Sequence, residues 1–342
     1  MRKKATAKQL KARLVILIVL FLVVFFGSFL LGRYPVDPIT LIKLLLSRAV
    51  DILPTWDSGA EAVFFQIRLP RVLAAALIGA ALSVAGAAYQ GLFRNPMVSP
   101  DILGASSGAG FGAALAIWLS VGYVGISLFA FISGLIAVIF AYALGSASRI
   151  NSTLSMVLSG MMVSSLFTAA TSFIKLIADT DEVLPAITYW LMGSLSSIRP
   201  QDVLFLVIPV ALSMGFLLAL RWRLNLLTIS DEEAAGIGVN VRRLRAVVIL
   251  CATLMTAACV SVSGLIGWIG LVIPHFCRLL FGYDYRWLLP TSALLGATFL
   301  IVVDDVARLL TTSEIPIGIL TAFVGAPVFA WLILTGGLKH GR

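Results

Sequence analysis

The sequence predicts an all-α polytopic membrane protein with about ten transmembrane helices. Of its 342 residues, 60% are hydrophobic and only 12% are charged, and the mean hydropathy is +1.04. Soluble domains carry roughly twice that share of charge, about 25%. About 20 apolar residues cross a bilayer as one helix. The apolar runs are continuous rather than alternating, which favours helices over a β-barrel.

Ten apolar stretches separated by polar, glycine or proline residues are the expected spans. They are 14–32, 70–92, 102–120, 122–147, 154–177, 203–220, 244–264, 266–281, 288–308 and 315–336. An even number puts both termini on one side of the membrane. With the basic residues 1–13 as a cytoplasmic tail, the inside segments carry about twice as many Lys and Arg as the outside segments, as the positive-inside rule requires. Residues 14–342 then form a single transmembrane domain.

Two arginines, Arg68 and Arg71, flank Pro70 just outside the second span. Proline suits the first turn of a helix, where its missing N–H costs nothing. The arginines either anchor the helix by snorkelling or offer two guanidinium groups to acidic residues of an outside partner. Within the span, Gly79 and Gly86 lie seven residues apart on one face, which predicts close packing against a neighbouring helix.

On the inside, Asn95 and Pro96 open a short polar turn that leads to Asp101 and a run of small residues. This turn either lines the cytoplasmic mouth of a pathway or is a helix start that Asp101 caps. The sequence contains no Gly-x-x-x-x-Gly-Lys-Ser/Thr motif. The chain therefore shows no P-loop of its own for ATP.

Residues 221–245 form the substantial inside loop. A short helix is expected there, capped by Ser230, with Asp231 and Glu232 in its first turn and Gly236 or Gly238 at its end. The loop is either a solvated connector or a docking helix that transmits force from a cytoplasmic protein.

Asp304 and Asp305 lie inside the ninth span, where carboxylates are costly and suggest function or a partner. Asp304 and Arg308 are four residues apart, so an ion pair on one helix face is expected, and Asp305 stays unassigned. The last span contains Gly318, Gly325 and Pro327, which predict a kinked pathway wall. The three cysteines lack metal-ligand spacing, so no metal site is expected.

Several motifs in one order resemble the FecCD family, the permease subunits of ABC importers for iron–siderophores, haem and vitamin B12. They are Arg68 to Arg71, Asn95 and Pro96 through Gly104, Ser107 to Ala109, Trp190 to Gly193, Ala234 to Gly238, Gly264 to His275, Asp284 with Arg286 to Pro290, Asp304 to Arg308, and Glu314 to Pro327. The resemblance covers nearly the whole chain after the first span. Ser230-Asp231 stands where the family usually has Gly-Glu, and Asp305 replaces a residue that is usually apolar.

The resemblance implies a type II ABC importer permease: a homodimer with ten helices per subunit, in a prokaryotic plasma membrane. Two P-loop ATPase subunits that bind ATP and Mg would dock below it, and one extracytoplasmic binding protein above, so this chain would be no enzyme and would hold no cofactor. Arginines matching Arg68, Arg71 and Arg308 would receive acidic residues of the binding protein.

The same resemblance implies ATPase contacts over Ser230, Asp231, Glu232, Ala234, Ala235, Gly236 and Gly238, and a pathway near Asn95, Pro96, Gly318, Gly325 and Pro327. The cargo would be a chelated iron complex or a corrinoid.

Two other classes compete with this interpretation. A proton-driven secondary transporter would use Asp304 and Asp305 as its relay. A membrane-embedded enzyme is disfavoured, because the sequence has no His-Glu-x-x-His motif and no plausible Ser/His pair. No nucleic-acid partner is expected, because the net charge of +9 is concentrated at membrane flanks.

Overall fold

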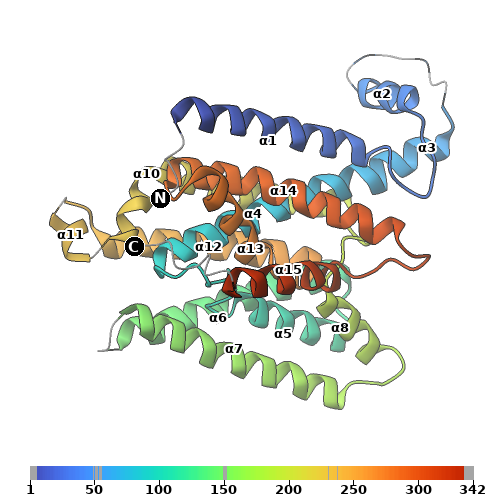
Figure 1. The fold of residues 1–342 in the computed structure, drawn as a ribbon. Helices are drawn as coiled ribbons and strands as arrows, with labels where there is room; N and C mark the ends of the chain where they lie inside the picture. Colours follow the sequence, from blue (N-terminus) through green and yellow to red (C-terminus); the bar gives the residue numbers. More distant parts are fainter. Residues whose placement is uncertain are drawn as a thin grey trace.

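The structure, a computed structural model, describes residues 6–48, 50, 53, 56–148, 152–229, 231–236 and 238–334. The described residues form helices and connecting turns, with no strand among them. The long helices run side by side between two ends of the bundle (Figure 1). We call the end with the start of α1, α10 and α11 the inner end, and the end with α2, α3, α8 and residues 310–316 the outer end.

The helices follow one another along the chain in this order: α1 (Ala7–Ser28), α2 (Pro38–Leu46), α3 (Ser58–Ala62), η1 (Val63–Arg68), α4 (Leu69–Leu92), α5 (Ala105–Trp118), α6 (Tyr123–Ala147), α7 (Ser152–Ile177), α8 (Val183–Met192), α9 (Pro200–Ala219), α10 (Arg221–Leu224), η2 (Asn225–Thr228), α11 (Asp231–Gly236), α12 (Val241–Ser263), α13 (Ile269–Phe281), α14 (Tyr285–Leu309) and α15 (Ile317–Leu334). Each of the ten expected spans contains one long helix. Within the described residues, 8 helices are long and apolar enough to cross a membrane, while α5 and α13 are shorter, with 14 and 13 residues.

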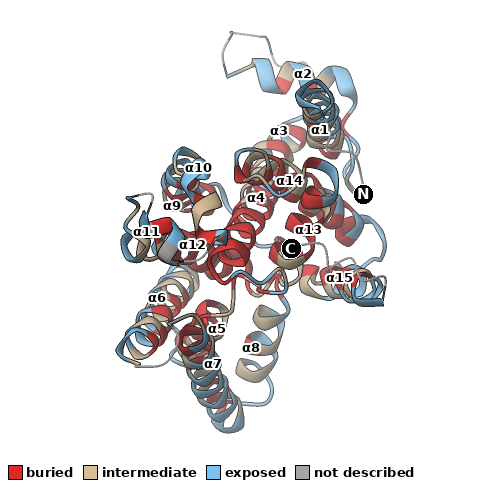
Figure 2. Cartoon of the chain, turned by 60° about the vertical axis from the view of Figure 1, so that its left-hand side comes forward, coloured by how far each residue is buried: buried red, intermediate tan, exposed pale blue. Residues whose placement is uncertain are grey.

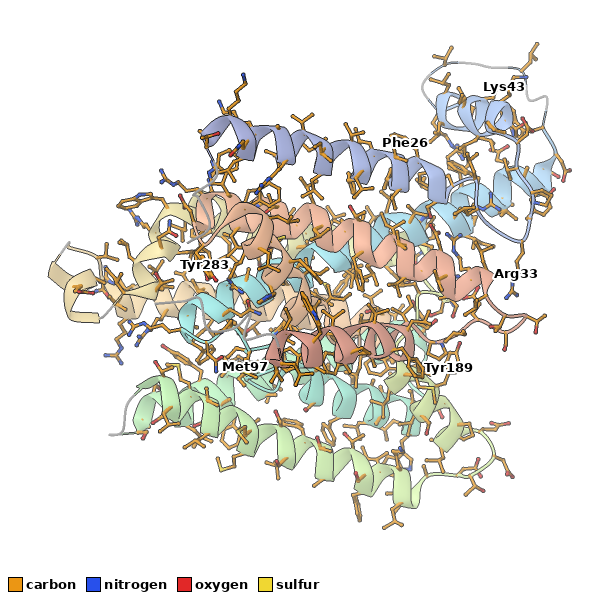
Figure 3. All side chains as sticks on the ribbon, viewed as in Figure 1. Phe26, Arg33, Lys43, Met97, Tyr189 and Tyr283 are labelled. Atoms are coloured by element: carbon orange, nitrogen blue, oxygen red, sulfur yellow. The ribbon has the colours of Figure 1, made fainter. Side chains whose placement is uncertain are left out.

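Side chains from successive connections fall at alternate ends, as the predicted topology requires. Arg33 and Tyr189 lie toward the outer end and Tyr283 lies toward the inner end (Figure 3). A short helix, α2, follows α1 at the outer end, and Asp37 caps it by accepting a 2.9 Å hydrogen bond from the N–H of Thr40.

The first helix begins earlier than predicted, at Ala7 instead of residue 14. A capping box explains the start, because the N–H of Thr6 donates to Oε1 of Gln9 at 2.9 Å while the N–H of Gln9 donates to the hydroxyl of Thr6. The lysines and arginines that follow are good helix formers. The described part of the basic tail is therefore helical and continuous with the first expected span.

The second expected span also begins earlier, since α3, η1 and α4 form one continuous helix over residues 58–92. The middle segment, Val63–Arg68, is a π-helix. Such wide turns occur within longer helices, often at functional sites. Arg68 and Arg71 consequently lie inside a long helix and not at its beginning, contrary to the prediction.

Two helices, α4 and α12, occupy the centre of the bundle, where 78% of each apolar segment is buried (Figure 2). The small face of α4 allows this. A Cβ on Gly79 would lie 2.2 Å from the carbonyl oxygen of Gly296 in α14, and one on Gly86 would lie 1.8 Å from that of Gly270 in α13. The predicted close packing of this face is confirmed.

The helical structure is interrupted between α12 and α13, at residues 264–268, which we call the break. Gly264 and Trp268 both have positive φ angles, +68° and +70°. The seventh and eighth expected spans are therefore two separate helices, α12 and α13, joined by a turn. A Cβ on Gly264 would lie 2.3 Å from the carbonyl oxygen of Trp190, so the glycine is required by both conformation and space.

Candidate functional site

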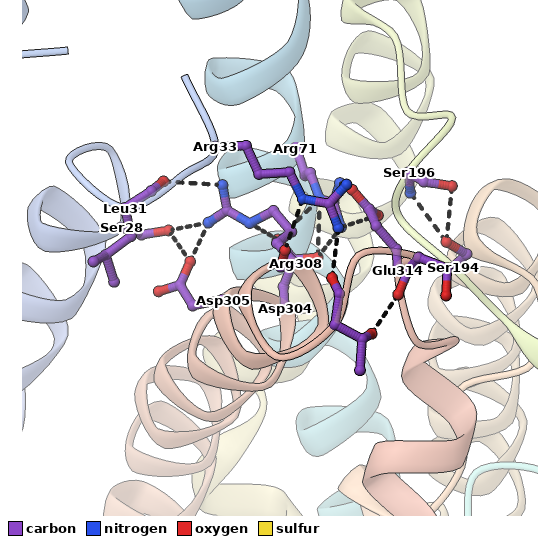
Figure 4. Close-up of polar contacts among 12 residues, drawn as sticks. Ser28, Leu31, Arg33, Arg71, Ser194, Ser196, Asp304, Asp305, Arg308 and Glu314 are labelled. Atoms are coloured by element: carbon purple, nitrogen blue, oxygen red, sulfur yellow. Dashed lines mark hydrogen bonds and ion pairs between the residues drawn. The ribbon is translucent and has the colours of Figure 1, made fainter. Parts of the chain in front are cut away.

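The outer end holds a buried cluster of arginines and carboxylates from α1, α4, α14 and the 310–316 turn (Figure 4). Arg71 is its centre. The Nη2 of Arg71 lies 2.9 Å from Oδ1 of Asp304 and 2.8 Å from Oε2 of Glu314, and its Nη1 donates to Oε1 of Glu314 at 3.0 Å. The two-pronged contact with Glu314 is the strong, directional form of the pair.

Arg308 makes a second branch of the cluster. Its Nε lies 3.3 Å from Oδ2 of Asp304, the residue one helical turn earlier. Its Nη2 contacts Asp305 and donates to the hydroxyl of Ser28 at 3.0 Å. Ser28 in turn donates to Oδ1 of Asp305 at 2.6 Å. Asp305, which sequence reasoning left unassigned, therefore ties α14 to the end of α1.

Arg68 differs from the other two arginines because it is held by carbonyl groups. Its Nη1 donates to the carbonyl oxygen of Phe29 at 2.9 Å, and its Nη2 donates to that of Tyr34. Arg68 is 3% exposed, Arg71 4% and Arg308 6%. In this structure all three arginines are buried and engaged within the chain, and their role in receiving acidic residues of a partner stays a prediction.

The cluster is balanced in formal charge, since it contains three arginines and the three carboxylates of Asp304, Asp305 and Glu314. The ion pairs are made by Arg71 and Arg308, whereas Arg68 contacts carbonyl oxygens. Isolated buried charges are expensive, and only mutual pairing and full hydrogen bonding compensate them. Glu314 is the accessible member, because its side chain is 26% exposed whereas that of Asp304 is 1% exposed.

At the inner end, the short helix expected in the 221–245 loop is present as α11, followed by Gly238 with φ +82°, and its role in coupling stays a prediction. Ser230 lies outside the described residues, and the side chains of Asp231, Glu232 and Ala235 are not described. Ala234 is buried, and Gly236 and Gly238 are exposed. A short helix therefore stands out at the inner end between α9 and α12 (Figure 1).

Two contacts anchor the segment before α11 to the rest of the bundle. The side-chain amide of Asn225 donates to Oδ1 of Asp284 at 2.9 Å and accepts from the N–H of Tyr285 at 3.0 Å. Arg94 donates through Nε to the carbonyl oxygen of Leu227 at 2.9 Å. Sequence reasoning gave Asn225 no role, because its partner lies 59 residues away.

Asp284 caps α14 from the turn after α13. Burial alone raises the pKa of its carboxyl group, but hydrogen bonds from the N–H of Arg286, the amide of Asn225 and the guanidinium of Arg286 more than offset this. The net effect lowers the pKa of Asp284, so the side chain that holds Asn225, in the segment before α11, is a carboxylate at neutral pH.

The expected pathway residues fall into two separate groups. Gly318 and Gly325 pack at the 264–268 break, where a Cβ on Gly318 would lie 2.3 Å from the carbonyl oxygen of Met192 and one on Gly325 would lie 2.5 Å from Cβ of Trp268. An open cavity of about 570 Å³ adjoins them, lined by α8, the break and α15.

Asn95, in contrast, forms a local turn after α4 by accepting a 2.9 Å hydrogen bond from the N–H of Met97. Pro96 is half-buried in the same turn, and Pro327 is exposed on α15, which continues through it. The structure does not bring Asn95 and Pro96 together with the glycines of α15.

Comparisons with known proteins agree with this architecture. The model of the FecCD transport family matches residues 19–335. The molybdate import system permease protein MolB of Haemophilus influenzae is 41% identical, with 96% of this chain and 95% of that protein aligned. A probable iron chelatin transport system permease protein of Helicobacter pylori is 44% identical over 81% of this chain and 83% of its own length.

A solved metal-chelate type ABC transporter in an inward-facing conformation has a similar fold. Its TM-score is 0.85 at 38% identity, and the alignment covers 95% of this chain and 99% of that one. The family match spans more than half of the chain, and the helices have the length and composition of membrane spans. The chain is therefore a multi-pass membrane protein of the FecCD transport family.

Proposed function

We propose that this chain is the membrane-spanning subunit of an ATP-driven importer, working as a homodimer with two ATP-binding subunits and one extracytoplasmic binding protein. ATP and Mg would be bound by the partner subunits. The chain would lie in a prokaryotic plasma membrane with both termini cytoplasmic. The observation that carries the proposal is the short helix α11 at the inner end of a FecCD-family bundle. Hydrogen bonds tie the segment before α11 to the start of α14 and to the end of α4.

The proposed coupling follows from those ties. A cytoplasmic ATPase that pushes α11 would move η2, because only Ile229 and Ser230 separate the two elements. Asn225 would transmit that movement to Asp284 and Tyr285, where α14 begins. The force would therefore reach α4 and α14 directly.

The proposed cargo is a chelated iron complex, such as a siderophore or haem, or a corrinoid. The solved relative is of the metal-chelate type and the Helicobacter relative is named for iron chelatin transport, which supports a chelate. The Haemophilus relative is named for molybdate at a comparable identity. We infer that the binding protein, and not this chain, makes most of the selection among these cargoes.

The proton-driven alternative is not favoured. A relay carboxylate must gain and lose a proton during transport, whereas Asp304 and Asp305 are held by Arg71, Arg308 and Ser28. In this structure both carboxylates therefore serve as partners within the chain.

The test is transport in proteoliposomes that contain the chain and the ATPase subunit that purifies with it from the native host. Uptake should require ATP and survive a proton uncoupler. Replacing both Asp231 and Glu232 with Ala should leave ATP hydrolysis and abolish the uptake that depends on it. The control is Asp181→Ala, in an exposed outer connection. Uptake that persists without ATP and collapses with the uncoupler would reject the importer.

A further inference from the structure

The outer end carries an arginine that lies beside the balanced cluster and takes part in none of its ion pairs. Arg33 is exposed, and it extends from the segment after α1 across the start of the 310–316 turn. Its Nε donates to the carbonyl oxygen of Arg308 at 3.3 Å and its Nη2 donates to that of Thr311 at 2.7 Å. Figure 4 shows its guanidinium group over the middle of the cluster, between Arg308 and Glu314.

The charge of Arg33 is not neutralised by the described part of the chain. Asp304 is taken by Arg71 and Arg308, Asp305 by Arg308, and Glu314 by Arg71. Arg33 itself forms no ion pair with any described carboxylate. A guanidinium group has five N–H donors, and the two carbonyl contacts leave three of them available.

The two carbonyl contacts also fix where this charge is presented. Ordering a long side chain costs free energy when a partner binds, and a group already held in place avoids part of that cost. The guanidinium plane suits two-pronged recognition of a carboxylate. The geometry is therefore that of a prepared cation site for an acidic group approaching the outer end.

We propose that Arg33 binds a carboxylate of the extracytoplasmic binding protein when that protein docks at the outer end. This proposal rests on the proposed function. It favours a protein partner over an anionic lipid because the guanidinium lies over the end of the bundle, against the turn between α14 and α15, and not along the outer side of α1.

The position also links docking to the pathway. Thr311 begins the turn that ends at α15, and the N–H of Ile317 at the start of α15 donates to the carbonyl oxygen of Gly193 at 2.9 Å. A carboxylate bound at Arg33 would lie on the same turn as Glu314. Docking would thus apply force to α15, whose residue Gly318 packs against the break at 264–268.

The experiment measures binding of the purified cognate binding protein to the complete transporter in nanodiscs. The variants are Arg33→Glu, Arg33→Gln and Arg33→Lys. The matched control is Arg48→Glu, another exposed arginine of the outer end that is already occupied by Glu61 at 3.8 Å and by the ring of Phe65. Thermal unfolding of each variant shows that the fold is retained.

The expected result is that Arg33→Glu weakens binding about tenfold, mainly through the association rate and most strongly at low salt, as for charges at the edge of an interface. Arg33→Gln should weaken it less, Arg33→Lys least, and Arg48→Glu should have no effect. Exchange of an acidic residue of the binding protein for Lys should restore binding to the Arg33→Glu variant alone.

Unchanged affinity of Arg33→Glu would overturn the proposal. If Arg33→Glu keeps its affinity for the binding protein and also loses anionic lipid, measured as phosphatidylglycerol retained on purification, Arg33 would be assigned to the membrane. A wild-type transporter that binds no binding protein would instead reject the proposed function, so the two failures are distinguishable.

Discussion

The two ends of the bundle each contain an arginine–carboxylate contact of the same length in very different surroundings. At the outer end, Arg71 and Asp304 meet at 2.9 Å with side chains 5% and 1% exposed. At the inner end, Arg286 and Asp284 also meet at 2.9 Å, with side chains 58% and 33% exposed. Distance alone would rank these contacts as equal.

Burial separates them in energy and in role. An exposed pair contributes about 0–1 kcal/mol because water and salt screen it. Breaking a buried pair by removing one partner costs about 3–5 kcal/mol, because the remaining charge is left uncompensated. The outer cluster therefore joins α1, α4 and α14 through buried contacts, whereas the exposed pair at the inner end contributes little to stability.

The largest expected effect comes from Asp304→Asn. The substitution keeps the size of the side chain but leaves the three buried arginines of the cluster with two carboxylates, so that one buried positive charge is uncompensated. We expect a loss of about 3–5 kcal/mol in the free energy of unfolding, measured by denaturation in mixed micelles. A loss below about 1 kcal/mol would show that water reaches the cluster and would remove the contrast between the ends.

The next effect tests whether shape also contributes to rigidity. Gly86→Ala places a Cβ 1.8 Å from the carbonyl oxygen of Gly270, so α4 and α13 must separate. Overpacking of this kind costs about 1–3 kcal/mol. Gly215→Ala in α9 is the control, because a Cβ there meets nothing within 4 Å. Equal unfolding free energies for the two variants would contradict the close packing.

A smaller effect on stability is expected for Asn225→Ala, which removes both hydrogen bonds to the 284–285 turn. Each is worth about 1 kcal/mol. The larger consequence should be functional, since ATP hydrolysis would continue while transport falls. Thr228→Ala is the control, because among the described residues the hydroxyl of Thr228 donates only to the carbonyl oxygen of Asn225, within its own segment. Transport that stays coupled to ATP hydrolysis at the wild-type level would show that force passes from α11 to α14 without Asn225.

The smallest effect is expected for Asp284→Asn, the inner counterpart of Asp304→Asn. Asparagine still caps the helix, so the free energy of unfolding should fall by at most about 1 kcal/mol through loss of the exposed pair with Arg286. The ratio between the two Asp→Asn variants, measured under one set of micelle conditions, is the direct measure of the comparison.

Much of the fold was predictable because hydropathy and backbone hydrogen bonding leave few options in a bilayer. Every backbone polar group must be satisfied within the segment, so a continuous apolar run becomes a helix. The ten expected spans each contain one. Their beginnings were less accurate: the capping box at Thr6 and Gln9 extended α1, and the π-helix Val63–Arg68 joined α3 to α4.

The site was predictable only where its parts are near in sequence. The spacing of Asp304 and Arg308 suggested a contact, and the two residues lie 3.3 Å apart. Ser28 and Asp305 are 277 residues apart, and Arg71 and Glu314 are 243 apart. No local pattern signals such contacts, so Asp305 had no partner on sequence grounds and Glu314 no role.

The sequence by itself determined a helical membrane protein, its family and the alternation of its connections between two sides, because these depend on composition, period and motif order. Only the tertiary structure decided which arginines are accessible. Arg68, Arg71 and Arg308 are buried where three helices converge, while Arg33 is exposed at the same end. Whether a charge is screened or desolvated depends on what surrounds it in space, and that is set by packing between residues distant in the chain.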